Sequence, residues 1–190
     1  MTVSGVRDRT MIETLYNTGM RRMELVNLTL YDIDYRRGAV WIRQGKNQKD
    51  RFIPIGNSAL SWITKYQDDA RAELVLEPDN GTLFLTDYGE RFKRDALSNL
   101  VKRYLIKAGI TTLGSCHLFR HACATHMLEN GADIRFIQQL LGHEDLSTTE
   151  IYTHVSIDIL KAIHQATPPS DCQTMQADNV ENEADYTPEN

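Results

Sequence analysis

The sequence predicts a mainly α-helical domain with a small three-stranded antiparallel β-sheet. Most of the chain repeats apolar residues every three to four positions, which is the spacing of amphipathic helices. Residues 31–55 instead alternate apolar and polar side chains in short runs, which is typical of antiparallel strands. A chain of 190 residues is long enough to bury a sizeable core. The sequence contains no internal repeat, no glycine-rich nucleotide-binding motif and no paired CxxC motif.

In the first half of the chain, two helices precede the extended segments. The expected elements are helices at 7–17 and 21–28 and strands at 31–35, 39–44 and 51–55. The first helix ends at Thr18-Gly19, and the last two strands form a hairpin whose polar turn, 45–50, is too long to be tight. Pro54 indicates that the last strand lies at an edge of the sheet, because proline cannot donate a backbone hydrogen bond.

The second half is predicted to be helical. Its expected helices are residues 58–76, 97–108, 115–130 and 133–141, followed by a last helix that contains Ile157, Leu160 and Ile163. The clearest apolar pattern is the one at 97–108, which Gly109 closes. Pro168-Pro169 ends the last helix, because proline cannot continue the hydrogen-bond pattern.

The C-terminal segment 168–190 differs in composition from the rest of the chain. It holds six acidic residues and no lysine or arginine. Without those six acids the formal net charge of -5 becomes +1, so the preceding body can still carry a basic face. Because the segment is also poor in large apolar residues, we expect one domain at 1–167 and an acidic, disordered tail at 168–190.

The three cysteines are Cys116, Cys123 and Cys172. An odd number without a CxxC motif argues against a disulfide framework and is typical of a reducing compartment. The chain has no apolar stretch long enough to span a bilayer and no signal peptide. We therefore expect a cytoplasmic protein without a membrane partner.

The functional interpretation depends on the segment 140–154, which reads LLGHEDLSTTEIYTH. Gly142 follows an apolar run, where a left-handed residue commonly ends a helix. A capping box that begins at Ser147 would start the next helix. His143 then lies in the turn and Tyr152 in the new helix, so both side chains could reach one point. Taken alone, they would be interpreted as a surface histidine and a packed aromatic residue.

Polar side chains also gather at the ends of other expected elements. The complete set is Arg21, Lys46, His117, Arg120, His143 and Tyr152. Two guanidiniums match the non-bridging oxygens of a phosphodiester, a phenol can attack phosphorus once deprotonated, and a lysine can protonate a departing alkoxide. His117 and His121 could instead bind a metal, but no carboxylate or cysteine is clearly placed to complete such a site. We therefore expect no metal and no cofactor.

These residues lie in four boxes that resemble the catalytic domain of tyrosine recombinases, the phage integrase family, and most closely its Xer-type members. The boxes are TGMRRMEL at 18–25, GKNQKDR at 45–51, HLFRH at 117–121 and the segment 140–154. The resemblance runs from about residue 7 to residue 166 and implies the fold of that catalytic domain. A single box would be weak evidence, whereas four in order at fitting separations are specific.

The resemblance implies that the chain cuts and rejoins double-stranded DNA. The two arginines of the set would clamp the scissile phosphate, and the two histidines would hydrogen-bond it and assist proton transfer. Lys46 would be the general acid for the 5′ oxygen. Tyr152 would form a 3′-phosphotyrosyl link, which keeps the bond energy and requires neither ATP nor a metal ion. Glu24 is expected to support the arginine box rather than to react.

The resemblance also suggests where partners bind. The basic residues expected to contact DNA are Arg43, Lys49, Arg51, Lys93 and Arg94. The segment 155–166, which follows the tyrosine, is expected to dock on a neighbouring protomer and so to form homo- or hetero-oligomers on DNA. The acidic tail is interpreted as solubilising, with an autoinhibitory mimic of DNA as the alternative.

The family normally carries a separate helical core-binding domain before the catalytic one. This chain begins almost at the first catalytic helix, so we expect that N-terminal domain to be absent. Two alternatives to recombination remain open at this stage. One is relaxation of supercoils, as in type IB topoisomerases, and the other is a non-catalytic DNA-binding or assembly module that regulates full-length recombinases.

Overall fold

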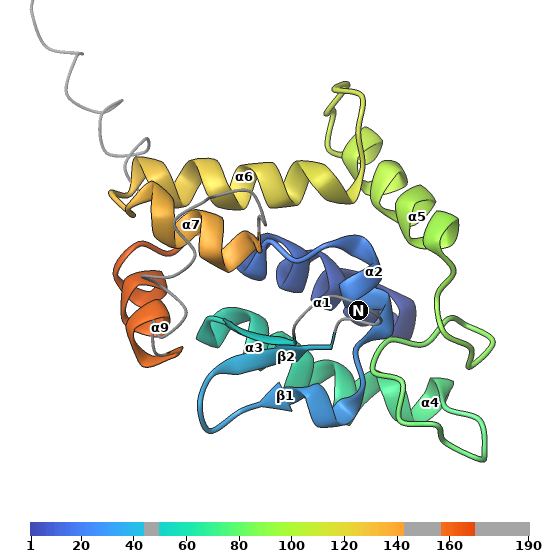
Figure 1. Ribbon diagram of the computed structural model, residues 1–190. Helices are drawn as coiled ribbons and strands as arrows, with labels where there is room; N and C mark the ends of the chain where they lie inside the picture. The colour runs from blue at the N-terminus through green and yellow to red at the C-terminus, as the bar shows by residue number, and fades with distance from the viewer. Residues whose placement is uncertain (44–49, 143–156, 170–190) are drawn as a thin grey trace, which may run out of the picture.

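Helices pack around one central helix and beside a small sheet in the computed structural model, which describes residues 1–43, 50–142 and 157–169 (Figure 1). Its helices are α1 (Val3–Thr18), α2 (Arg22–Asn27), α3 (Asn57–Tyr66), α4 (Ala72–Leu74), α5 (Arg94–Lys107), α6 (Cys116–Glu129), α7 (Ile134–Leu141) and α9 (Ile157–Ala166). A 3-10 turn η1 (Leu30–Asp32) precedes strands β1 (Ile33–Asp34), β2 (Ala39–Ile42) and β3 (Arg51–Pro54), and a π-helical turn η2 (Gln67–Arg71) follows α3. The predicted fold class is confirmed.

Helix α1 lies at the centre of the molecule, between α6 and α3 (Figure 1). Leu15 on this helix has no exposed surface. The helix begins earlier than expected, at Val3, because the Thr2 hydroxyl accepts the Gly5 N–H at 3.1 Å and caps the first turn. It ends at Gly19, whose φ of 60° is the left-handed conformation that glycine adopts without strain.

The sheet has the strand order β1-β2-β3, with antiparallel neighbours. Trp41 and Phe52 are paired across β2 and β3, and their rings stack at 5.5 Å. Pro54 ends the edge strand β3, as predicted. Strand β1 is shorter than expected because η1 takes up the residues before it. Asp32 closes that turn, because its Oδ2 accepts two hydrogen bonds from Thr29, one from the backbone N–H at 2.8 Å and one from the side-chain hydroxyl at 2.7 Å.

The helix expected at 58–76 is not continuous. Helix α3 passes into the π-helical turn η2 and then into the short helix α4. The additional residue of a π turn lets the neighbours Ala70 and Arg71 both face the interior. Arg71 donates to the Thr82 carbonyl at 2.8 and 3.1 Å and pairs with Asp79 at 2.8 Å, which ties the following loop to the helix.

Most of the apolar side chains predicted to face inward on the later helices are buried, although Ile134 is 50% exposed. The buried ones include Leu97, Leu100, Val101 and Leu105 on α5, Cys123 and Met127 on α6, and Ile137, Leu140 and Leu141 on α7. Ser115 is the N-cap residue of α6, as expected, although its side chain makes no capping hydrogen bond. Helix α7 ends at Gly142, whose φ of 65° confirms the predicted left-handed cap.

Helix α9 packs against β3 and α7 of the same chain. His164 on α9 is only 2% exposed, and its Nε2 lies 2.8 Å from the backbone oxygen of Asn17 in α1. Beyond α9, the side chain of Asn130, the C-cap residue of α6, donates to the Pro168 carbonyl at 2.6 Å. These contacts attach the end of the described chain to the body of the domain.

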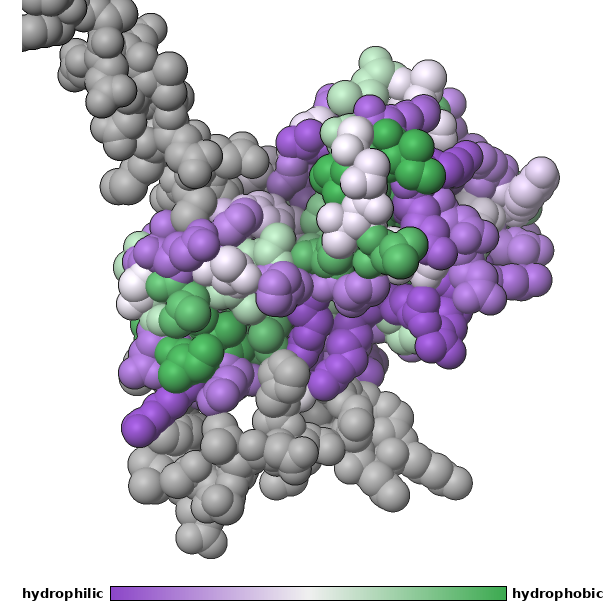
Figure 2. Space-filling model, turned by 90° about the horizontal axis from the view of Figure 1, so that it is seen from above, coloured by the Kyte–Doolittle hydropathy of each residue, from purple (hydrophilic) through white to green (hydrophobic). Residues whose placement is uncertain are grey.

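The face of the molecule seen in Figure 2 is mostly hydrophilic. Figure 2, seen from above relative to Figure 1, shows hydrophilic side chains over much of that face, interrupted by hydrophobic patches. Exposed large apolar residues include Ile106, Ile110 and Leu113, which lie at the end of α5 and in its connection to α6. In the part of the chain that the structure describes, no helix combines the length and the apolar character needed to cross a membrane.

Candidate active site

Arg21 is held in place from two directions. It is the N-cap residue of α2, and its backbone N–H donates to Glu24 Oε2 at 2.8 Å. Its guanidinium donates through Nη1 to Glu24 Oε1 at 3.1 Å and through Nη2 to the Gly142 carbonyl at 2.8 Å. The side chain is nevertheless 44% exposed. The guanidinium is therefore positioned and still accessible to a ligand.

Arg120 connects the ends of two helices from its place on α6. Its Nη1 donates to the Gly19 carbonyl at 2.7 Å, and its Nη2 donates to the Leu141 carbonyl at 2.7 Å. Burial lowers the pKa of Arg120, and the positive charge of Arg21 lowers it further, against the opposing effect of Glu24. The charge of Arg120 is thus held at an energetic cost that a nearby anion would offset.

His117 lies about one turn before Arg120 on α6 and is exposed. Both side chains border a pocket of about 280 Å³. Its lining residues are Met20, Arg21, Arg22, Ser115, Cys116, His117 and Arg120. The structure therefore brings Arg21, at the start of α2, together with His117 and Arg120 on α6, and the sequence analysis had assigned all three to one site.

The remaining residues of the predicted catalytic set lie outside the described residues. These are Lys46, His143 and Tyr152, and the same holds for Lys49 among the residues expected to contact DNA. Gly142, which precedes His143 in the sequence, is described and accepts the hydrogen bond from Arg21. The described part of the site thus reaches the residue next to the His and Tyr segment.

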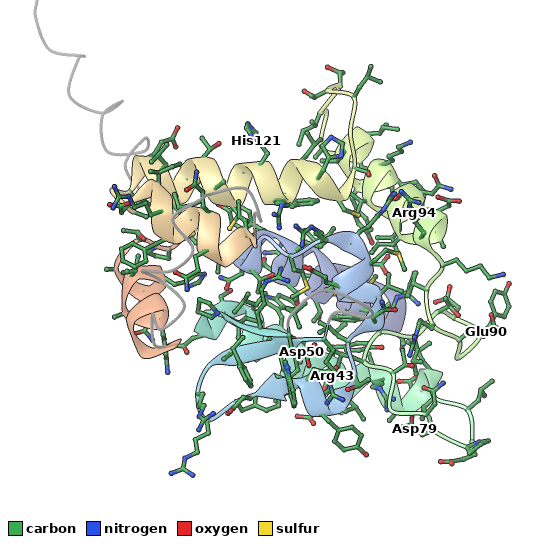
Figure 3. All side chains as sticks on the ribbon, in the orientation of Figure 1. Arg43, Asp50, Asp79, Glu90, Arg94 and His121 are labelled. Carbon is green, nitrogen blue, oxygen red and sulfur yellow. The ribbon has the colours of Figure 1, made fainter. Side chains whose placement is uncertain are left out.

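Three of the basic residues expected to contact DNA are exposed. Arg43 follows β2, is 55% exposed, pairs with Asp32 at 2.7 Å and lies 4.6 Å from the centre of the Trp41 ring. Lys93 and Arg94 are exposed at the start of α5. Figure 3 shows Arg43 extending from the sheet region and Arg94 from α5.

Arg51 differs from these residues because it is directed inward. Its side chain is only 17% exposed, and its Nη2 lies 3.0 and 3.1 Å from the two carboxylate oxygens of Glu24. Arg51 therefore shares its acidic partner with Arg21. This sharing could not be predicted from the sequence, because the two arginines are far apart along the chain.

Four pocket residues were not among the predicted site residues, namely Met20, Arg22, Ser115 and Cys116. Arg22 donates from Nη1 to the Ser98 hydroxyl at 2.7 Å and so connects α2 with α5. Cys116 is buried, and burial raises the pKa of its thiol, which disfavours the nucleophilic thiolate. The only sequence signal for Cys116 was its position beside His117.

In residues 1–43, 50–142 and 157–169, no three His, Cys, Asp or Glu side chains are grouped so that they could hold a metal ion. His121, which is spaced i,i+4 from His117, projects from the side of α6 that faces away from the sheet (Figure 3). The chemistry of the described pocket is instead that of an anion site, because guanidiniums and an imidazole line it.

The sequence profile described as the phage integrase family matches residues 2–158. The chain belongs to the phage integrase family. Tyrosine recombinase XerC 2 of Ralstonia nicotianae is 53% identical over 169 residues, which cover 89% of this chain and 48% of that protein. Tyrosine recombinase XerD of Pseudomonas putida is 45% identical over 160 residues, covering 84% of this chain and 53% of that protein. The predicted resemblance to Xer-type tyrosine recombinases is confirmed, and the chain spans about half the length of these relatives.

Solved structures agree with this assignment. The crystal structure of XerA recombinase has a TM-score of 0.67 and 33% sequence identity, with coverage of 85% of this chain and 56% of that chain. The XerH site-specific recombinase bound to difH substrate, a pre-cleavage complex, has a TM-score of 0.66 and 25% identity, with coverage of 83% and 45%. The fold is therefore that of tyrosine recombinases.

Proposed function

We propose that residues 1–167 form the catalytic domain of a site-specific tyrosine recombinase, which cuts and rejoins double-stranded DNA through Tyr152. The observation that carries this proposal is the pocket lined by Arg21, His117 and Arg120. Membership of the phage integrase family and the likeness to a recombinase whose structure contains its DNA substrate support the same chemistry. We interpret 168–190 as an acidic tail outside this domain.

The pocket has the charge and geometry that a scissile phosphate requires. A guanidinium presents several N–H donors in one plane and matches two phosphate oxygens at once. Arg21 and Arg120 are both fixed before any ligand arrives, through bonds to Gly142, Gly19 and Leu141. Donors that are already oriented stabilise the extra negative charge of a pentacoordinate transition state without a cost of reorganisation.

In the proposed reaction the Tyr152 phenol oxygen attacks phosphorus and forms a P–O bond while the bond to the 5′ oxygen breaks. His117 and His143 hydrogen-bond the phosphate and assist removal of the phenol proton, and Lys46 protonates the departing 5′ oxygen. The product is a 3′-phosphotyrosyl link and a free 5′ hydroxyl. A second 5′ hydroxyl reverses the step, because the phosphodiester energy is retained in the link.

The test is formation of a covalent complex with DNA. Duplexes from a pool of candidate sites are nicked near the cut, so that the released piece diffuses away and the intermediate accumulates. A denaturing gel then separates free from protein-linked DNA, in buffer that contains EDTA and no ATP. We expect adduct from the unmodified protein and from Tyr88→Phe, which removes the hydroxyl of a tyrosine that is 81% exposed. Tyr152→Phe should form none.

Each other outcome has a defined meaning. DNA binding without an adduct on any substrate would favour a non-catalytic module that assembles with full-length recombinases. Adduct formation together with relaxation of supercoiled plasmid, but no exchange between two sites, would favour a topoisomerase-like activity. An adduct that EDTA abolishes would contradict metal-independent chemistry.

We further propose that several copies act together on DNA, with Arg43, Lys49, Lys93 and Arg94 contacting the phosphate backbone. The segment 155–166 would dock on a neighbouring protomer, in place of the contacts that α9 makes within its own chain. Sedimentation with and without DNA tests this, and a stable dimer in the absence of DNA would count against it. Such a DNA partner, together with the free thiols of Cys116 and Cys123, favours a cytoplasmic location.

A further inference from the structure

A third guanidinium lies beside the two arginines of the candidate site. Arg51 is the first residue of β3, paired with Ile42 across the hairpin. Its Nη2 contacts both oxygens of Glu24, at 3.0 and 3.1 Å, and the two side chains are 17% and 9% exposed. A charge pair this well buried has a defined geometry, since neither partner can turn toward water.

Glu24 is a shared acceptor. The same carboxylate that holds Arg51 accepts the Arg21 backbone N–H at 2.8 Å and its Nη1 at 3.1 Å. The position of Arg21 therefore depends on the position of Glu24, and that of Glu24 depends on Arg51. This chain of contacts joins the strand hairpin to the arginine box, which are distant in sequence.

Arg51 also fixes the end of α7. A Cβ added to Gly142 would lie 3.1 Å from both Cζ and Nε of Arg51, so the guanidinium is packed against the glycine. The carbonyl of the same glycine accepts the hydrogen bond from Arg21 at 2.8 Å. Arg51 thus supports Arg21 from two sides, through a carboxylate and through the backbone that Arg21 binds.

The contacts of Arg51 favour a supporting role over a contact with DNA. Its Nη2 is bound to Glu24, and its Nε and Nη1, which have no hydrogen-bond partner among the described residues, are buried and present no surface to a duplex. At 17% exposure it offers little surface to a duplex, whereas Arg43 is 55% exposed. Its charge still acts on the site, because it contributes to the lowered pKa of Arg120.

We propose that Arg51 is a positioning residue for the strand-transfer reaction, which holds Glu24 and thereby orients Arg21 toward the scissile phosphate. This inference rests on the proposed function. It assigns to Arg51 no contact with the substrate. Its loss should therefore change the rate of the bound complex rather than the affinity for DNA.

The kinetic test compares Arg51→Met, Arg51→Lys and the control Arg9→Met. Arg9 is also an arginine paired with a glutamate, Glu13, but is 55% exposed on α1 and lies outside the pocket. We expect Arg51→Met to slow adduct formation at saturating DNA by about 10- to 100-fold, as misplaced catalytic groups do, with an unchanged Kd. Arg51→Lys should recover part of the rate, and Arg9→Met should match the unmodified protein.

A double variant tests whether Arg51 acts through Glu24. If it does, the loss of rate in Arg51→Met combined with Glu24→Gln should be clearly smaller than the product of the two single losses. Multiplicative losses would overturn the inference. A direct contact with DNA would also overturn it. In that case Arg51→Met would raise the Kd for DNA and leave the rate at saturation unchanged, and the salt dependence of the Kd would fall by about one phosphate contact.

A measurement without DNA separates this inference from the proposed function. The Nε–H resonance of Arg21, assigned by its loss in Arg21→Lys, reports the order of that side chain by NMR relaxation. We expect its order parameter to fall in Arg51→Met and to stay constant in Arg9→Met. An unchanged value would overturn the positioning role even if the protein cleaves DNA, and a fall would support it even if no substrate is cleaved. If Arg51→Met does not fold, the same measurements are made on Arg51→Lys.

Discussion

Acidification should loosen the docking of α9, because His164 is buried at the contact between α9 and α1. The side chain is 2% exposed and its Nε2 lies 2.8 Å from the Asn17 carbonyl, a contact that the neutral imidazole satisfies by donating one N–H. Burial lowers the pKa of His164 from the ordinary 6.5, while the hydrogen bond to Asn17 partly opposes that shift. The folded protein therefore resists protonation at this position.

The sign and size of the effect follow from proton linkage. Above the unfolded pKa of 6.5, His164 is neutral in both states, so its contribution to stability is fully present. Below that pH the unfolded or undocked chain binds a proton that the folded chain excludes. The free energy of unfolding then falls by up to about 1.4 kcal/mol per pH unit, until the lowered folded pKa is reached. From pH 6.5 to 5.0 the loss is at most about 2 kcal/mol, or a fall in Tm of roughly 4–8 °C.

The assay is thermal unfolding from pH 7.5 to 5.0, with hydrogen exchange of the α9 amides over the same range. His164→Gln is the control, because glutamine can still donate to the Asn17 carbonyl but does not titrate. Other carboxylates and histidines contribute equally to both proteins and cancel in the difference. The unmodified protein should lose stability more steeply than the variant below pH 6.5, with faster exchange in α9. Parallel curves for the two proteins would refute the reasoning.

Three further predictions concern the surroundings of the pocket. Glu24→Gln removes a carboxylate that Arg21 and Arg51 share. Because Arg21 is partly exposed to solvent, we expect the free energy of unfolding to fall by only about 2–3 kcal/mol, which lowers Tm by roughly 4–12 °C. Added sulfate should recover part of the lost stability, since it can pair with the two arginines. Gly19→Ala should lower the free energy of unfolding in urea by more than Gly109→Ala. Both glycines have a positive φ, but only at Gly19 would the new Cβ meet another side chain, Leu141, at 2.7 Å. Equal losses of stability would exclude this clash. Burial raises the pKa of Cys123 to about 12, so little of its thiol is ionised at pH 8. Mass spectrometry should therefore find Cys123 unmodified after the native protein is treated with iodoacetamide at that pH. Modification of Cys123 in the native protein would contradict this burial.

The helices were predictable where the apolar pattern is strong. Helices α5, α6 and α7 follow the predicted ranges closely, and Gly142 ends α7 as expected. The differences arise where one side chain overrides the pattern. Asp32 closes a 3-10 turn that shortens the first strand, and Arg71 faces the interior through a π turn that interrupts the helix after β3. Neither contact can be inferred from periodicity, since each depends on partners that the fold supplies.

In the candidate site, too, some features could be predicted from the sequence and others depend on contacts that form only on folding. The i,i+3 spacing in α6 fixed the relation of His117 to Arg120 from sequence alone, because both lie on one turn. Arg21 was grouped with them because it also lies at the end of an expected element, and the structure places all three around one pocket. The role of Arg51 could not be predicted, because an arginine beside a polar turn is ordinarily exposed. Its burial depends on Glu24 and Gly142, which reach it only in the folded chain.

Backbone carbonyls accept several of the hydrogen bonds from the arginines, which explains how the site can be rigid and still attract an anion. Arg120 is fixed by two backbone carbonyls, and Arg21 is fixed in part by a third. Carbonyl oxygens orient a guanidinium without cancelling its charge, whereas a carboxylate partner for each arginine would neutralise the pocket. The lowered pKa of Arg120, caused by burial and then by the charge of Arg21, is the consequence expected of this arrangement. Glu24 offsets part of the repulsion among the three arginines, and the positive charge that remains is available to a phosphate, which would relieve it on binding.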